Sequence, residues 1–235
     1  MGLFRSIYRP VIHGRALSAD PTVCYWPQRR LGYRLNHPAH QPSDRSAGLD
    51  TLALEDWARV NIVGSSGSGK STLRRKLADE LGHPPVEIDA LFWGPNWTEP
   101  VDTEFMARLE KALEPTTWVL DGNYDRTRPI KWPRATMVIW LDLPYWQVLW
   151  QVFTRTMKRS LTQETLWSGN QESLRKAFLS RDSILLWSIS NLGKIRRRYE
   201  RAMQSTDYPH LHWIRLRSRR DIQRLLSHVE TMGNR

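Results

Sequence analysis

One stretch with the pattern G-x-x-x-x-G-K-S, from Gly64 to Ser71, constrains the fold of this chain more than any other feature. An apolar run at residues 60–63 precedes it, and a helical pattern over residues 70–81 follows it. Glycines at three of its positions let the main chain curl so that N–H groups face an anion. The helix that starts beside the curl adds the positive end of its dipole. The pattern therefore predicts a phosphate-binding loop between a strand and a helix, with an ordinary Gly/Ser turn as the alternative.

A loop of this type predicts ATP and Mg²⁺ as cofactors. Lys70 is expected to reach the β- and γ-phosphates, and the hydroxyl of Ser71 to bind the metal ion. The candidate nucleotide-binding residues of the loop are Gly64, Ser65, Ser66, Gly67, Ser68, Gly69, Lys70, Ser71 and Thr72.

The sequence after residue 59 alternates between strand and helix patterns, which favours an α/β fold with a parallel sheet covered by helices. The predicted strands are residues 60–63, 86–88, 118–120, 137–141 and 212–216. The predicted helices are residues 70–81, 102–113, 145–160, roughly 192–204, and 219–230. Ser218 and Asp221 have the spacing of a capping box at the start of the last helix.

The chain has 235 residues, enough for one domain with an appendage. We expect residues 1–55, which are rich in proline and lack a regular period, to form a poorly ordered extension. A transit peptide or an upstream start codon would also explain them. Residues 56–235 are the predicted folded domain. The single cysteine, Cys24, excludes an internal disulfide and fits a reducing cytoplasm. The longest apolar run, residues 137–150, is interrupted by Asp142 and Pro144, so we expect no integral membrane protein.

Two acidic residues directly follow predicted strands, where open α/β sheets bind ligands. We expect Asp121 to assist Mg²⁺ through its water shell. Asp89 is expected to face the acceptor and to take a proton from it if the acceptor is a hydroxyl. The alternative for either residue is a carboxylate that caps a helix or turn. Asp142 also ends a strand, and there we favour a structural role.

Residues 155–190 are predicted to form an arginine-rich lid. Arg155, Arg159, Arg175 and Arg181 lie there among small polar residues, and a closing lid would bring guanidinium groups onto the transferred phosphoryl group. A solvated face is the alternative for any one of these arginines. Trp93 and Trp97, by contrast, either wall the acceptor pocket or pack in the core.

Basic residues concentrate toward the C-terminus, since residues 144–235 hold seventeen basic side chains against seven acidic ones. Such a field attracts phosphates on nucleotides, metabolites or nucleic acids alike. The run Arg196, Arg197, Arg198 and Arg201 is expected to be a solvated helix face, with contact to nucleic acid as the alternative.

Taken together, these residues resemble the adenylate-kinase-like branch of P-loop kinases. More narrowly, they are similar to bacterial proteins grouped under the label "DNA topology modulation", or FlaR-related. The resemblance spans roughly residues 59–228 and is carried by residues 62–73, 87–93, 118–127, 138–144 and 216–219. The phosphate loop is shared by many families, whereas Asp-Ala-Leu-Phe-Trp and Asp-Gly-Asn-Tyr are more specific.

This resemblance implies a three-layer P-loop NTPase fold with a five-stranded parallel sheet of order 2-3-1-4-5 and a lid after the fourth strand. It supports Asp121 beside the metal and acceptor, places Arg155 and Arg159 on ATP phosphates, and points to Arg217 and Ser218 for the adenine. The segment at residues 88–93 differs from the AMP-binding segment of adenylate kinases. An acid there is more like that of sugar and shikimate kinases, in which it binds a hydroxyl.

The function expected from the sequence is an ATP-dependent phosphotransferase that acts on a small molecule or a nucleotide, as a monomer or a homodimer. The alternative is a nucleotide-switched regulatory protein that binds nucleic acid through the basic C-terminal region. That alternative is less favoured, because the arginines are scattered over the lid and loops and form no recognisable reading helix.

Overall fold

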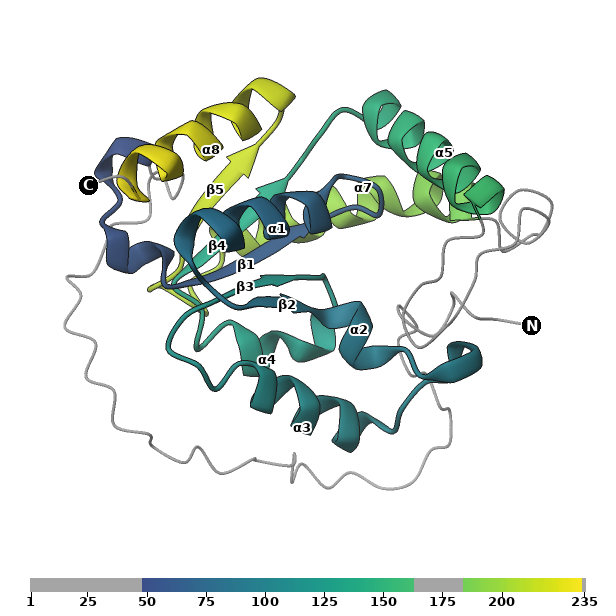
Figure 1. Ribbon diagram of the computed structural model, residues 1–235, viewed down its shortest axis with the longest axis horizontal. Coiled ribbons are helices and arrows are strands. Elements are labelled where there is room, and N and C mark those ends of the chain that lie inside the picture. The colour runs from purple at the N-terminus through teal and green to yellow at the C-terminus, as the bar shows by residue number, and fades with distance from the viewer. Residues whose placement is uncertain (1–47, 163–183, 234–235) are drawn as a thin grey trace.

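The computed structural model describes residues 48–162 and 184–233, and its centre is a five-stranded parallel sheet. The strand order is β2-β3-β1-β4-β5, and every neighbouring pair is parallel (Figure 1). The strands are β1 (Arg59–Gly64), β2 (Pro85–Glu87), β3 (Trp118–Asp121), β4 (Met137–Leu141) and β5 (His212–Leu216). The five predicted strands and the predicted order 2-3-1-4-5 are confirmed.

The central strands are apolar on both faces, which is typical of a parallel sheet covered by helices. In β4, Val138 and Trp140 belong to one buried cluster, whereas Met137, Ile139 and Leu141 belong to another. Successive side chains of a strand point to opposite faces, so the two clusters lie on opposite sides of the sheet.

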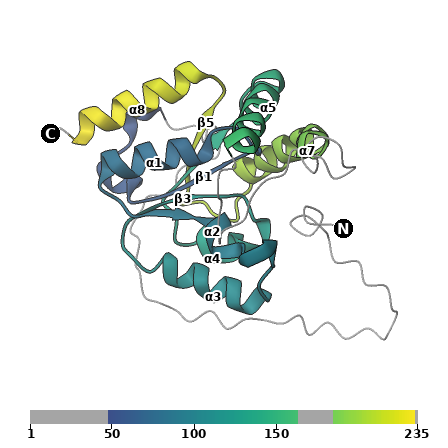
Figure 2. The same cartoon turned by 45° about the vertical axis from the view of Figure 1, so that its right-hand side comes forward.

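Helices form the two outer layers (Figures 1 and 2). Buried residues of α1 (Lys70–Leu81) and α8 (Arg219–Gly233) belong to the cluster on one face. The opposite cluster includes residues of α2 (Ile88–Phe92), α3 (Asp102–Ala112) and α7 (Ile184–Gln204), with the short α4 (Arg128–Lys131) beside them. With the glycine-rich loop between β1 and α1, this is the three-layer P-loop NTPase fold.

The helix predictions hold in the main, with differences at α7 and at two short helices. α5 spans Tyr145–Thr162, close to its predicted range, whereas α7 begins at Ile184 rather than near residue 192, and α2 and α4 were not predicted. The capping box of α8 is confirmed, because Ser218 N donates to Asp221 Oδ2 at 2.9 Å and Asp221 N donates to Ser218 Oγ at 3.1 Å.

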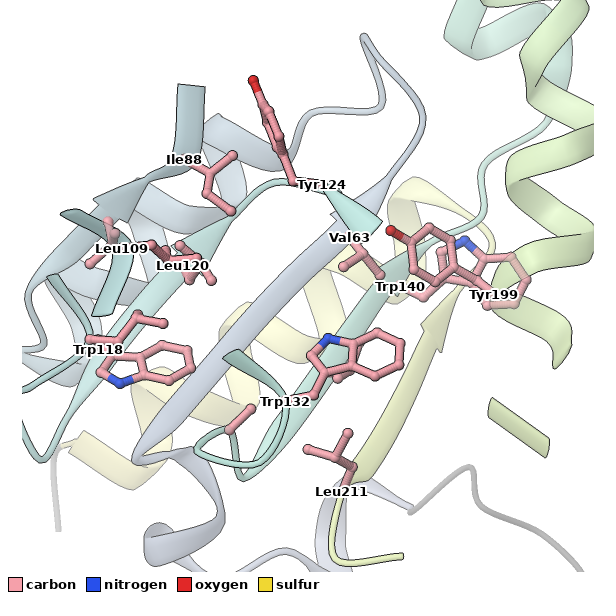
Figure 3. Packing of buried hydrophobic residues seen from close by; sticks show 14 of the residues in the cluster. Val63, Ile88, Leu109, Trp118, Leu120, Tyr124, Trp132, Trp140, Tyr199 and Leu211 are labelled. Atoms are coloured by element: carbon pink, nitrogen blue, oxygen red, sulfur yellow. The ribbon is translucent and has the colours of Figure 1, made fainter. Parts of the chain in front are cut away.

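The tryptophans at 118, 140 and 213 are core residues, as predicted, with at most 1% of their surface exposed. Figure 3 shows Trp118, Trp132 and Trp140 on the face that also carries Tyr124 and Tyr199. Within the described ranges, no helix has both the length and the apolar character needed to cross a bilayer.

Two short 3₁₀ turns, Leu49–Thr51 and Leu54–Trp57, precede β1. Leu52 and Trp57 are buried in the cluster beneath α1 and α8. The packed part of the chain therefore starts before the predicted boundary at residue 55. Residues 1–47, most of the predicted extension, lie outside the described residues.

Candidate active site

The glycine-rich loop leaves the C-terminal end of β1 and enters α1 at Lys70, as the motif predicts. Gly64 has a φ of +150°, and a Cβ there would lie 2.8 Å from the carbonyl oxygen of Leu141 and 2.9 Å from Ser68 Oγ. Gly67 has a φ of +76°, and a Cβ there would lie 2.3 Å from Val152 Cγ2 in α5. Both positions therefore need glycine, because of close neighbours as well as backbone conformation.

Lys70 folds back onto this loop. Its Nζ donates to the carbonyl oxygens of Gly64, at 3.1 Å, and Ser65, at 2.9 Å. Burial lowers the pKa of Lys70, and the negative charges of Asp121 and Asp89 oppose that effect, whereas Arg155 adds to it. The ammonium group is thus a donor held at the loop, able to exchange these carbonyls for phosphate oxygens.

The hydroxyl residues of the loop differ in exposure, with Ser66 intermediate. Ser71 and Thr72, in the first turn of α1, are exposed, whereas Ser65 and Ser68 are buried. The first pair is thus open to a ligand at the positive end of α1, which suits a metal–phosphate complex.

Asp121 is the last residue of β3 and is only 4% exposed. Its Oδ2 lies 3.4 Å from Arg74 Nε but has no hydrogen bond within the described part of the chain. Arg74 also pairs with Glu87, at 3.3 Å. A buried carboxylate oxygen without a hydrogen bond, beside the phosphate loop, fits a group that assists Mg²⁺, which prefers oxygen ligands and retains its waters.

Asp89 follows β2, as predicted, but lies in the first turn of α2, because β2 ends at Glu87 and the helix begins at Ile88. The hydroxyl of Tyr124 donates to Asp89 Oδ1 at 2.6 Å. Burial raises the pKa of Asp89, opposed by this hydrogen bond and by the charge of Lys70. A carboxylate with a raised pKa is a better proton acceptor than an exposed one.

Arg155 reaches the phosphate loop from α5, where its Nη2 donates to Ser66 Oγ at 3.4 Å. Its charge also acts on Lys70 and Asp89. Arg159 belongs to α5, but its side chain is outside the described structure. Arg175 and Arg181, with most of the predicted lid, likewise lie outside the described residues.

The predicted adenine contacts follow β5, at the same edge of the sheet as the phosphate loop. The main-chain N–H groups of Arg217 and Ser218 both donate to Asp221 Oδ2, at 2.9 Å. The loop is thus fixed to the start of α8, and the adenine role of the two residues stays a prediction.

The structure adds Asn123 to the site, a residue to which the sequence analysis gave no role. Its side-chain Oδ1 accepts from Gly64 N at 3.1 Å, and its Nδ2 donates to Gly64 O at 2.8 Å. Beside it, Lys131 is fully buried and donates to the carbonyl oxygens of Gly122 and Asn123. The Asp-Gly-Asn-Tyr stretch is the sequence signal that marks this position.

The other residues that the sequence singles out, Trp93, Trp97 and Asp142, lie in packed or ion-paired surroundings. Trp93 is 4% exposed and belongs to the core, and Trp97 packs against that cluster. Asp142 accepts from Arg196 Nε at 2.7 Å and from Arg215 Nη2 at 2.6 Å, as suits the structural role favoured for it.

Comparisons with solved structures find kinases of similar fold. A shikimate kinase from Acinetobacter baumannii, solved in complex with shikimate, is 18% identical, with 76% of this chain and 94% of that chain covered and a TM-score of 0.46. A shikimate kinase from Bacteroides thetaiotaomicron is 16% identical, with 76% and 99% covered and a TM-score of 0.43. A gluconokinase from Sinorhizobium meliloti is 14% identical, with 76% and 94% covered and a TM-score of 0.41.

No protein-family model and no curated protein matches the chain. The likenesses to solved structures are too remote to assign a substrate. The fold assignment therefore rests on the strand order and the loop geometry, and the narrower resemblance to the "DNA topology modulation" proteins stays a prediction.

Proposed function

We propose that this protein is an ATP- and Mg²⁺-dependent phosphotransferase whose acceptor is a small molecule with a hydroxyl group. One observation carries the proposal. Asp121, Asp89 and Arg155 converge on Lys70 of the phosphate loop closely enough for each charge to act on its pKa. They come from three different elements, β3, α2 and α5. An anion-binding loop, a buried base and an arginine at one sheet edge are the parts that phosphoryl transfer to a hydroxyl needs.

Each residue has a distinct part in the reaction. The loop from Gly64 to Ser71 holds the phosphates of ATP, and Lys70 moves from its loop carbonyls onto them. Asp89 accepts the proton of the acceptor hydroxyl as the hydroxyl oxygen bonds to the γ-phosphorus and ADP leaves. Arg155, already at Ser66, stabilises the charge on the transferred group.

Ser71 and Asp121 are the residues that would hold Mg²⁺, the serine through its hydroxyl and the aspartate through water. The ion supplies shielding of the negative charge on the phosphates. Asp121 also faces Arg74, so its carboxylate is held at the end of β3 by an opposite charge.

Ion pairs on α7 count against the alternative of a nucleic-acid-binding regulator. Two members of the arginine run on α7 are held by acids, since Arg196 pairs with Asp142 at 2.7 Å and Arg198 pairs with Asp125 at 2.5 Å. A duplex-binding face would need such guanidinium groups for phosphates.

The test is ATP consumption by the purified protein with hydroxy acids, sugars and nucleoside monophosphates as acceptors. We expect stimulation above basal hydrolysis by a hydroxyl compound, and loss of it in Lys70→Ala and Asp89→Asn, with ATP binding weakened in Lys70→Ala and unchanged in Asp89→Asn. Full turnover by Lys70→Ala would overturn the proposal.

A further inference from the structure

The side chain of Asn123 takes the place of main chain beside β1. The ladder between β1 and β3 pairs Ile62 with Asp121, and Gly122 N still donates to Ile62 O at 3.2 Å. If the ladder continued, both the N–H and the C=O of Gly64 would bond to the main chain after β3. Both groups are bonded instead to the amide of Asn123, at 3.1 Å and 2.8 Å.

Because the Asn123 side chain bonds to Gly64 in place of the main chain, the main chain after β3 is free to turn away from β1. Gly122 has a φ of +137° and Tyr124 a φ of +26°, so the main chain leaves the strand conformation here. The Gly122 carbonyl, released from the ladder, accepts from Lys131 Nζ at 3.1 Å. Tyr199 of α7 donates to Asn123 Oδ1 at 3.0 Å, which holds the amide from the other side.

Asn123 and Lys70 share one acceptor. The carbonyl oxygen of Gly64 accepts from Asn123 Nδ2 at 2.8 Å and from Lys70 Nζ at 3.1 Å. Gly64 is buried, so this oxygen needs a donor from the protein. When Lys70 leaves for a phosphate, the Asn123 amide keeps the carbonyl hydrogen-bonded.

We propose that Asn123 is a positioning residue which allows Lys70 to exchange its loop carbonyl for the phosphates of ATP. This inference rests on the proposed function, since it assigns a residue that prepares the nucleotide site. Without the Asn123 amide, departure of Lys70 would leave the buried carbonyl oxygen of Gly64 without a hydrogen bond. That cost would hold the lysine at the loop.

Isosteric replacement separates this role from general support of the loop. Asn123→Asp keeps the acceptor for Gly64 N and Tyr199 but loses the donor to Gly64 O, and its negative charge attracts Lys70. Asn123→Ala loses all of these bonds but adds no charge. If Asn123 merely supported the fold, both variants would weaken ATP binding only as far as they lower the Tm, and Asn123→Asp would lower it too, because its buried carboxylate faces the Gly64 carbonyl oxygen. If Asn123 releases Lys70, Asn123→Asp weakens ATP binding more than its loss of stability explains, because its charge also holds Lys70.

The experiment measures the Kd of Mg²⁺–ATP by calorimetry, together with the Tm, for the wild type, both Asn123 variants and Tyr199→Phe, which leaves the pair with Gly64 intact. We expect weakening on the order of tenfold for Asn123→Ala, more for Asn123→Asp, and less than about threefold for Tyr199→Phe. In a Lys70→Ala background, Asn123→Ala should change the Kd by less than about twofold.

Basal ATP hydrolysis supplies a second readout. We expect the KM for ATP to rise in the Asn123 variants while kcat at saturation changes little, because the effect is exerted before chemistry. Equal Kd values for all variants, a weakening of ATP binding that the loss of stability explains, a milder effect of Asn123→Asp than of Asn123→Ala, or a fall in kcat alone would overturn the inference. If Asn123→Ala does not fold, Asn123→Asp against Tyr199→Phe carries the test.

A failure of the proposed function is distinguishable from these results. If the wild type itself does not bind Mg²⁺–ATP, the proposed function falls, and this inference falls with it. If the wild type binds and the variants bind equally well, only the inference falls.

Discussion

The hydroxyl of Tyr124 donates a 2.6 Å hydrogen bond to Oδ1 of Asp89 and so joins the turn after β3 to the first turn of α2. Tyr124 makes this contact with a φ of +26°, a conformation that L-residues rarely adopt. Its ring packs on Phe92 and Phe105, at centroid distances of 5.1 and 5.5 Å. Packing thus holds the hydroxyl at the carboxylate despite the backbone strain.

Tyr124→Phe should move the acidic limb of the kcat/KM profile to higher pH. The hydrogen bond lowers the pKa of Asp89 against the raising effect of burial, so its loss raises that pKa further. The proton acceptor is then ionised only at higher pH, while the retained ring keeps the packing. Tyr208→Phe, a tyrosine in contact with Trp132, is the control. An unshifted limb in Tyr124→Phe would contradict the role of Asp89 as base.

Gly67→Ala should weaken ATP binding and lower the Tm, because the added Cβ would lie 2.3 Å from Val152 Cγ2 at a φ of +76°. Val152→Ala removes the clashing methyl groups, so the double variant should recover part of the loss. Gly69→Ala is the matched control, since its φ is +95° but no atom lies within 4 Å of the added Cβ. Equal losses in Gly67→Ala and Gly69→Ala would show that backbone conformation alone sets the requirement.

Lys131 gives the stability a predictable dependence on pH. Burial lowers its pKa from 10.5 to about 7, with a further lowering by Arg128, whereas Asp125 raises it. Between these values the unfolded chain binds more protons than the folded one, so the free energy of unfolding rises with pH, by up to ~1.4 kcal/mol per unit. The increment is complete above 10.5 and lost as the pH falls to about 7.

Lys131→Met lacks this titration. The stability of the wild type relative to the variant, measured by urea unfolding, should therefore increase with pH over that window. Lys111→Met, at an exposed position in α3, should keep a curve parallel to that of the wild type. A constant difference between the wild type and Lys131→Met would contradict the lowered pKa.

Asp142→Asn should lower the free energy of unfolding by about 2 kcal/mol, less than for a fully buried pair, because its arginine partners are partly exposed. The Asp142 side chain is 7% exposed, and those of Arg196 and Arg215 are 33% and 15% exposed. Asp102→Asn, which breaks an exposed pair with Arg126, should lower it by less than about 1 kcal/mol. Loss of ATP binding without loss of stability in Asp142→Asn would instead make this residue part of the site.

The sequence predicts the framework of the molecule because its signals are local. The apolar strands, the glycine positions of the loop and the Ser218–Asp221 capping box each depend on neighbours along the chain, and the structure has all of them. The five-residue helix α2 is too short for a 3.6-residue period to be visible, so the sequence predicts Asp89 at the end of a strand but no helix around it.

The contacts missed in the site join residues that are distant in sequence. Asn123 bonds to Gly64 across 59 positions, and a side-chain amide that replaces main chain leaves no periodic pattern. Lys131 was not expected inside, because lysine is rarely buried without a charged partner and its partners here are carbonyl oxygens.

The turn from Asp121 to Tyr124 has a consequence for how the protein can change over evolution. Its successive residues contact Arg74, Lys131, Gly64 and Asp89, each in a different element or loop. Insertion or deletion of one residue would misplace all of these contacts at once. We therefore expect descendants with a new acceptor to keep the length of this turn.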